Sequence, residues 1–151
     1  MPSELTPRAA FDLLQGSNEY VYLDVRTVQE FVDGRPAGAW NVPILERDPR
    51  TGQMQPNARF LAVVQAHFPK DKKLLVGCKS GGRSAAACNL LEAAGYQHLW
   101  NVAGGFVGKV SPGGEWIERG WSMLGLPVEE GASGAVQYAA LEAGKAPEGT
   151  P

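Results

Sequence analysis

The chain has 151 residues, enough for one ordinary globular domain with a real core and too few for two comfortable ones. Hydrophobic residues make up 44% of the sequence and charged residues 20%, a balance that excludes wholesale disorder. The net charge is −2 and no dense Lys/Arg cluster occurs, so we set nucleic-acid binding aside.

Nothing in the sequence indicates a membrane segment, an export signal or a metal site. No stretch is long and apolar enough to span a bilayer, so we expect no membrane partner. Residues 1–5 lack the basic start and apolar run of a signal peptide, which makes the cytoplasm the expected compartment. The two cysteines, Cys78 and Cys88, form no disulfide scaffold, and with the isolated His67 and His98 they show no zinc-ligand spacing.

Helices and strands alternate along the first half of the chain. In order, we expect a helix from Thr6 to Gly16, a strand at 20–25, a short helix at 27–32, a strand at 39–42, a loop at 46–56 and a helix that Asn57 caps. Thr27 and Glu30 have the spacing of a capping box, in which each side chain accepts the other residue's backbone N–H.

The second half continues the alternation and then loses it. We expect a strand at 73–77, a glycine-rich turn, a helix from 84 to 94, a strand at 98–102 and two short helices at 106–110 and 115–121. We assign one domain to residues 1–130. Residues 131–151 are interpreted as a mobile tail rich in Gly, Ala and Pro, in which 137–143 form at most a weak helix.

This order of elements predicts an α/β fold with a central parallel sheet and helices on both faces. Strand 73–77 is apolar without alternation, which is typical of a parallel strand covered on both faces. Ligands bind beyond the carboxyl ends of the strands in such sheets, and Cys78 directly follows this strand. Cys88 falls inside an alanine-rich helix with no charge nearby, so we expect it to pack in the core.

The segment after Cys78 has the composition of an anion-binding loop. Gly81 and Gly82 let the backbone take positive φ and turn N–H groups inward, and the following helix adds its positive end. Lys79 and Arg83 add formal positive charge nearby. These features favour a thiolate on Cys78, which is a nucleophile, and equally a persulfide anion, which is the thiolate extended by one sulfur.

The loop resembles the active-site loop of rhodanese-like domains, Cys-x-x-Gly-x-Arg-Ser, which is here Cys78-Lys79-Ser80-Gly81-Gly82-Arg83-Ser84. Residues 23–31 together with 38–43 resemble the first signature of that family, and 95–106 resemble its C-terminal signature. The three motifs occur in the right order, and the resemblance extends over residues 5–128.

This resemblance implies a rhodanese-like fold with a parallel five-stranded core. It implies a sulfurtransferase that moves a sulfane sulfur from a small anionic donor such as thiosulfate, through a persulfide on Cys78, to cyanide or a thiol acceptor, a protein thiol included. No metal or organic cofactor is required. We expect the donor to bind along the loop, at Lys79, Ser80, Gly81, Gly82, Arg83 and Ser84. Asp24 and Arg26 match family positions that brace the loop, and an Arg26–Glu30 ion pair is a further hypothesis.

Two departures from the family pattern leave the substrate open. Arg35 stands where the family often has histidine, and it adds positive charge near the expected site. A carboxylate-bearing donor such as mercaptopyruvate, held by Arg35 or Arg83, is therefore an alternative to thiosulfate. The stretch 107–123 is longer than the common ending of the family, and we expect its Trp116 and Trp121 to lie in the core.

Two other functions also stay open. Phosphatases and arsenate reductases of related fold use Cys-x5-Arg, whereas here four residues separate Cys78 from Arg83, and the shorter loop favours a smaller anion. The second alternative is a non-catalytic rhodanese-like regulatory module. Many such modules lack the cysteine that this chain carries.

Overall fold

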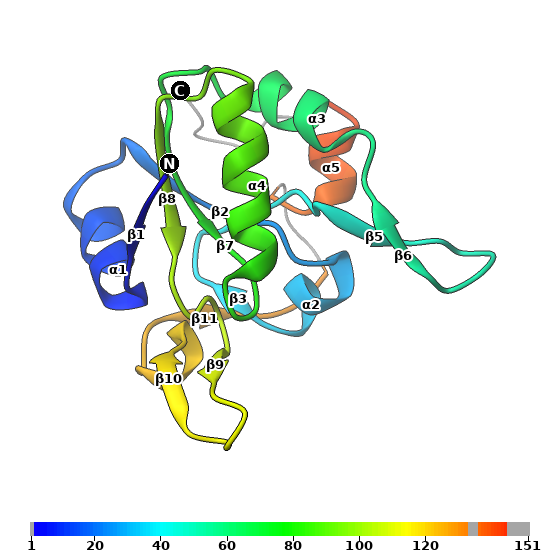
Figure 1. Ribbon diagram of the computed structural model, residues 1–151. Coiled ribbons are helices and arrows are strands. Elements are labelled where there is room, and N and C mark those ends of the chain that lie inside the picture. Colours follow the sequence, from blue (N-terminus) through cyan, green and yellow to red (C-terminus); the bar gives the residue numbers. More distant parts are fainter. Residues whose placement is uncertain (1, 133–135, 145–151) are drawn as a thin grey trace.

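A five-stranded sheet forms the centre of the computed structural model, which describes residues 2–132 and 136–144. In spatial order (Figure 1) its strands are β1 (Ser3–Leu5), β8 (His98–Val102), β7 (Lys73–Gly77), β2 (Tyr20–Asp24) and β4 (Trp40–Asn41). Each pairing between neighbours is parallel. The parallel five-stranded core is therefore confirmed, and β1 is a strand that the sequence pattern did not predict.

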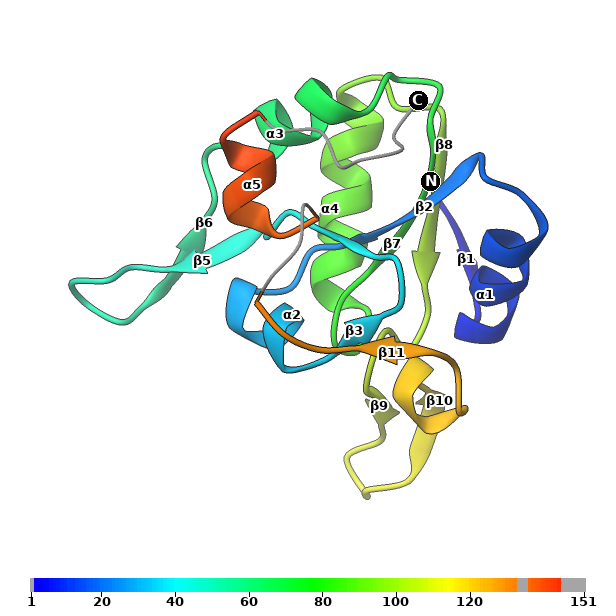
Figure 2. The ribbon, with the colours of Figure 1, turned by 180° about the vertical axis from the view of Figure 1, so that it is seen from behind.

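Helices cover both faces of the sheet (Figures 1 and 2). One face carries α3 (Phe60–His67), α4 (Gly82–Ala93) and α5 (Tyr138–Glu142), and the other carries α1 (Pro7–Gly16), α2 (Val28–Asp33) and the single turn η1 (Trp121–Met123). Strand β7 feeds both cores, because Leu74 and Val76 pack into the first and Leu75 into the second. None of the described helices is long and apolar enough to cross a membrane.

The helix starts follow the caps that the sequence contains, with one exception. The Thr6 side chain accepts an N–H of the first turn of α1. Thr27 and Glu30 form the predicted capping box of α2. Asn57 does not cap α3 itself, because it lies two residues before the N-cap Arg59, whose N–H its side chain accepts at 3.0 Å.

Short antiparallel strand pairs occupy three places outside the main sheet. The predicted loop at 46–56 contains a hairpin of β5 (Leu45–Arg47) and β6 (Met54–Pro56). A second pair joins β3 (Arg35–Pro36) to β11 (Val128–Glu129), which ties residues near position 130 back to the first half of the domain.

The third pair shows that the predicted helices at 106–110 and 115–121 are wrong. This stretch forms a hairpin of β9 (Gly108–Val110) and β10 (Trp116–Arg119). The Gly114 N–H donates to the Ser111 carbonyl, and this tight turn reverses the chain before a helix can develop.

Part of the predicted mobile tail packs against the core. Within residues 136–144, Tyr138 is 6% and Leu141 1% exposed, and both join the core formed by α3 and α4. The His67 ring and the Leu141 carbonyl are hydrogen-bonded at 2.8 Å. The expectation of a mobile tail is thus corrected for this segment, because two of its apolar residues pack into the core. Residues 133–135 and 145–151 of the predicted tail lie outside the described part of the chain.

Candidate active site

Cys78 lies directly after β7, at the carboxyl end of this central strand, as the sequence predicts. The chain turns at Gly81, whose φ of +122° favours glycine, and α4 begins at the next residue. The turn directs the Gly81 N–H at Cys78 Sγ, with 3.1 Å between nitrogen and sulfur. This donor and the adjacent N-terminus of α4 both stabilise negative charge on the sulfur.

A second polar contact to Cys78 comes from Ser84, in the first turn of α4. Its hydroxyl oxygen is 3.4 Å from Cys78 Sγ and 2.5 Å from Asn101 Oδ1. The Asn101 side-chain nitrogen in turn donates to Glu4 Oε2 at 3.0 Å. Sequence reasoning missed Asn101 and Glu4; the signal for Asn101 was a polar residue between the apolar Trp100 and Val102.

Arg83 is held by Glu30 of α2. Its two terminal nitrogens donate to the two carboxylate oxygens at 2.7 and 3.0 Å. Burial raises the pKa of Glu30, but the bonds from Arg83 and from the Thr27 N–H outweigh it and lower that pKa to about 2. The hypothesis of an Arg26–Glu30 pair is therefore wrong, and donor binding by Arg83 would compete with its bond to Glu30.

Asp24 and Arg26 form a buried pair beside the loop. The Arg26 guanidinium donates to both Asp24 oxygens, at 2.7 Å for the closest contact, and also to the Gly34 carbonyl at 2.7 Å. It lies over the ring of Phe106, 4.6 Å from the ring centre. Burial alone lowers the pKa of Arg26, but the carboxylate of Asp24 raises it above its usual value. This geometry fits the bracing role that the resemblance implied.

The glycine-rich segment of the C-terminal signature packs against the backbone of the Cys78 loop. The Phe106 N–H donates to the Cys78 carbonyl at 2.8 Å, and the Val107 N–H donates to the Lys79 carbonyl at 2.9 Å. A Cβ on Gly105 would lie 2.2 Å from the Cys78 carbonyl oxygen. Only glycine therefore allows this backbone to approach the loop so closely.

Cys88 packs in the core, as predicted. It is 1% exposed and lies among the apolar residues beneath α4. Burial raises the pKa of its thiol to about 12, so it is not ionised near neutral pH.

Arg35 is not available for substrate in the way the sequence suggested. It is 5% exposed and donates to the carbonyls of Phe31 and Gly131 at 3.0 and 2.8 Å. Its guanidinium stacks over the Phe31 ring at 4.5 Å. The hypothesis that Arg35 holds a carboxylate-bearing donor is corrected, because its guanidinium is bonded to α2 and to the chain near residue 131.

A hollow of about 370 Å³ opens beside the loop. Its walls are Glu4, Ser80, Gly81, Gly82, Ala85, Asn101, Ala103, Lys109 and Glu118. Of the predicted donor-binding residues, Lys79, Ser80 and Gly82 are exposed, whereas Ser84 is buried. Among residues 2–132 and 136–144, no group of three His, Cys, Asp or Glu side chains is placed to hold a metal.

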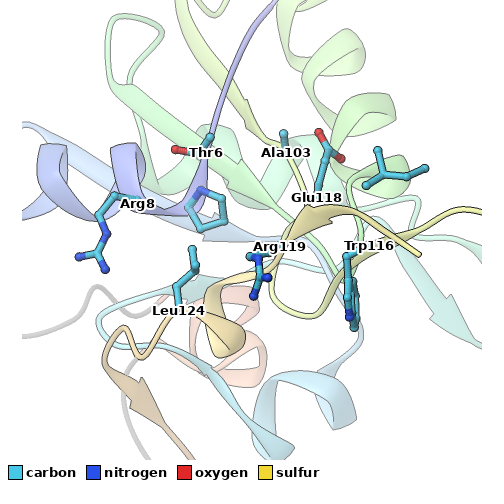
Figure 3. Close-up of a pocket in the computed structure, with 9 residues that line it drawn as sticks. Thr6, Arg8, Ala103, Trp116, Glu118, Arg119 and Leu124 are labelled. Carbon is cyan, nitrogen blue, oxygen red and sulfur yellow. The ribbon is translucent and has the colours of Figure 1, made fainter. Parts of the chain in front are cut away.

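A larger groove of about 540 Å³ separates α1 from the β9–β10 hairpin. Figure 3 shows Arg8 on the α1 side of this groove and Arg119 and Trp116 on the hairpin side. Trp116 is 48% exposed, which corrects its predicted core position, whereas Trp121 is 1% exposed, as predicted. None of the predicted site residues lines this groove.

A parallel α/β sheet with a cysteine loop at the carboxyl end of its central strand is the arrangement expected of a rhodanese-like domain. The chain belongs to the rhodanese-like domain family, whose model matches residues 8–110. The resemblance seen in the three sequence motifs is thereby confirmed.

Curated relatives and solved structures agree with this family. The chain is 36% identical over 129 residues to thiosulfate sulfurtransferase 16 of Arabidopsis thaliana, covering 85% of this chain and 94% of the relative. It is 38% identical over 131 residues to senescence-associated protein DIN1 of Raphanus sativus, covering 86% of this chain but 62% of that longer protein. The crystal structure of Rv0390 from M. tuberculosis superimposes with a TM-score of 0.69 at 28% identity, covering 85% and 98% of the two chains. Relatives named as sulfurtransferases support sulfurtransferase activity in general.

Proposed function

We propose that this protein is a sulfurtransferase that carries sulfane sulfur as a persulfide on Cys78. The observation that carries the proposal is the Gly81 N–H directed at Cys78 Sγ, at the carboxyl end of the central strand. A sulfur with a fixed donor and a helix N-terminus beside it holds negative charge, whether as thiolate or as persulfide.

The reaction proceeds in two displacements. The Cys78 thiolate attacks the outer sulfur of a thiosulfate-like donor, forming a sulfur–sulfur bond, and the donor's own sulfur–sulfur bond breaks so that sulfite leaves with the electron pair. A thiol or cyanide then attacks the outer sulfur of the persulfide, and Cys78 leaves as the thiolate. The exposed Lys79 attracts the anionic donor. Lys109 adds a positive charge to the hollow, which Glu4 and Glu118 also line, and Arg83 is already paired with Glu30.

Mass spectrometry after incubation with thiosulfate tests this proposal. The intact protein should gain the mass of one sulfur atom on Cys78 and lose it when cyanide or a thiol is added. The Cys78→Ser variant should gain nothing, and the Cys88→Ser variant should behave like the parent protein.

Two other outcomes would replace the proposal. Turnover of p-nitrophenyl phosphate without any turnover of thiosulfate would indicate a phosphatase. A protein that takes up sulfur from no donor, mercaptopyruvate included, would be a non-catalytic module.

A further inference from the structure

Three hydrogen-bonded side chains, Ser84, Asn101 and Glu4, link Cys78 to the edge strand β1. This row determines where the Ser84 hydroxyl proton points. Ser84 Oγ has three acceptors within reach: Asn101 Oδ1 at 2.5 Å, the Gly81 carbonyl at 3.1 Å and Cys78 Sγ at 3.4 Å. A serine hydroxyl carries one proton and donates to one acceptor at a time. The Gly81 carbonyl also accepts the Ala85 N–H at 3.1 Å, which leaves it one lone pair for the hydroxyl. Asn101 Oδ1 is the nearest of the three acceptors, so the hydroxyl proton lies on the Asn101 side.

Glu4 and the Gly81 carbonyl together determine which end of the Asn101 amide faces Ser84. Glu4 and Asn101 are register partners in the parallel pairing of β1 with β8, and the Asn101 nitrogen donates to Glu4 Oε2 at 3.0 Å and to the Gly81 carbonyl at 3.4 Å. An ionised carboxylate can only accept, so the amide nitrogen must face Glu4, and Oδ1 is left facing Ser84. The hydroxyl donates to this close oxygen and presents a lone pair to Cys78.

We propose that Glu4 and Asn101 are positioning residues that hold the Ser84 hydroxyl proton away from Cys78 Sγ. The inference rests on the proposed role of Cys78 as the sulfur carrier. While the hydroxyl donates to Asn101, the Gly81 N–H is the donor directed at the sulfur. Release of the hydroxyl from Asn101 lets it donate to the sulfur as well.

Several charged or titratable groups also surround the loop. They come from β1, β2, α2, α4, the loop itself and the hairpin: Glu4, Tyr22, Asp24, Arg26, Glu30, Lys79, Arg83, Cys88, Lys109 and Glu118. Asn101 carries no charge. Its replacement by leucine leaves every one of these charges in place, so any change in ionisation must come through the hydrogen bonds.

The test is the rate of Cys78 alkylation by iodoacetamide as a function of pH, in a Cys88→Ala background that leaves one thiol. Asn101→Leu removes the competing acceptor, so the hydroxyl is free to donate to the thiolate. Alkylation on the acidic side of the profile should rise about tenfold, the size expected for a hydrogen bond to a charged group. In a Ser84→Ala background the same replacement should change nothing. No rise with Ser84 present, or an equal rise with and without it, would overturn the proposal.

Glu4→Gln is a second variant, at an exposed position that leaves the core intact. A glutamine amide can donate as well as accept, so Asn101 can turn its nitrogen toward Ser84 and drive the hydroxyl toward Cys78. Alkylation should rise more when Ser84 is present than in the Ser84→Ala background, where the rise measures the lost charge alone. Equal rises in the two backgrounds would overturn the proposal.

These alkylation measurements are independent of sulfur transfer. Alkylation of Cys78 needs no sulfur donor, so the comparisons can be read in a protein that takes up no sulfur. A failure of sulfur uptake would therefore refute the proposed function, whereas unchanged alkylation in Asn101→Leu would refute the positioning role of Asn101.

Discussion

The Glu30 side chain bonds to the starts of two helices at once. Its carboxylate completes the capping box at the start of α2 and also binds Arg83 at the start of α4. These two helices flank the Cys78 loop, so a single side chain ties them together. The role usually expected of a loop arginine, to attract an anion, is here partly replaced by a structural one.

Replacing Glu30 with glutamine should flatten the acid side of the stability curve. The folded-state pKa of about 2 lies below the ordinary value of 4.5, so the folded protein holds this proton less tightly than the unfolded chain. The stabilisation is complete above pH 4.5 and is lost as the pH falls from 4.5 towards 2. Urea unfolding across this range should show a smaller loss for Glu30→Gln than for the parent, and the exposed control Glu115→Gln should keep the parent's slope. Parallel curves for parent and Glu30→Gln would contradict the assignment.

Tyr22 of β2 packs tightly against Gly77 of β7. Its hydroxyl is buried and has no hydrogen-bond partner within the described ranges, and a Cβ on the neighbouring Gly77 would lie 1.9 Å from it. Tyr22→Phe should leave the free energy of unfolding unchanged or raise it by about 1 kcal/mol, since an unsatisfied polar group is removed. Gly77→Ala should lower it by at least about 2 kcal/mol through overpacking. Chemical denaturation measures both, and a clearly destabilised Tyr22→Phe would show that the hydroxyl is in fact satisfied.

Among the elements, those with local sequence signals were predicted and those without them were not. The capping box at Thr27 and the apolar run of β7 identify their elements by themselves. Strand β1, with the sequence Ser-Glu-Leu, has no such pattern and becomes a strand only because β8 offers it a free edge. The β9–β10 hairpin likewise depends on a turn whose residues are equally typical of a break between two helices.

Helix α5 is anchored to the core by Leu141. Leu141 is 1% exposed, so Leu141→Ala should lower the free energy of unfolding by about 2–5 kcal/mol, as for other buried leucines. Leu90 of α4 is 43% exposed, and Leu90→Ala is a matched control that should cost less than about 1 kcal/mol. Urea denaturation of the two variants decides the matter. Equal and small effects would restore the mobile tail that composition alone suggested.

Across the whole molecule, the residues contiguous with Cys78 and the bracing pair Asp24 and Arg26 could be predicted, whereas the other partners of the loop could not. Residues 78–84 are identified by the cysteine, the glycines and the charges that stand together. The partners of that loop arrive from distant segments: Glu30 from α2, Glu4 and Asn101 from the β1–β8 edge. Only the order of strands in the sheet brings these groups together, and a single sequence does not reveal that order.

The same architecture predicts different behaviour for two cysteines that are almost equally buried. Cys78 is 2% and Cys88 1% exposed, and both belong to the core beneath α4, but Cys78 lies in the loop that follows β7, whereas Cys88 lies within α4. A local opening of the loop exposes Cys78, while Cys88, whose thiol pKa burial raises to about 12, must wait for unfolding of the domain. Peptide mass spectrometry after iodoacetamide treatment at neutral pH should therefore find Cys78 modified first.

The Leu141→Ala variant distinguishes local opening of the Cys78 loop from unfolding of the whole domain. If it lowers the free energy of unfolding by about 2 kcal/mol, the unfolded fraction and the labelling of Cys88 should both rise about 30-fold, because labelling follows the population of the open state. The labelling rate of Cys78 should stay as in the parent protein, since the hydrogen bonds of the loop at Gly81 and Ser84 do not involve α5. Equal acceleration at both cysteines would mean that the loop opens only when the whole domain unfolds, and the separate behaviour argued for the Cys78 loop would be wrong.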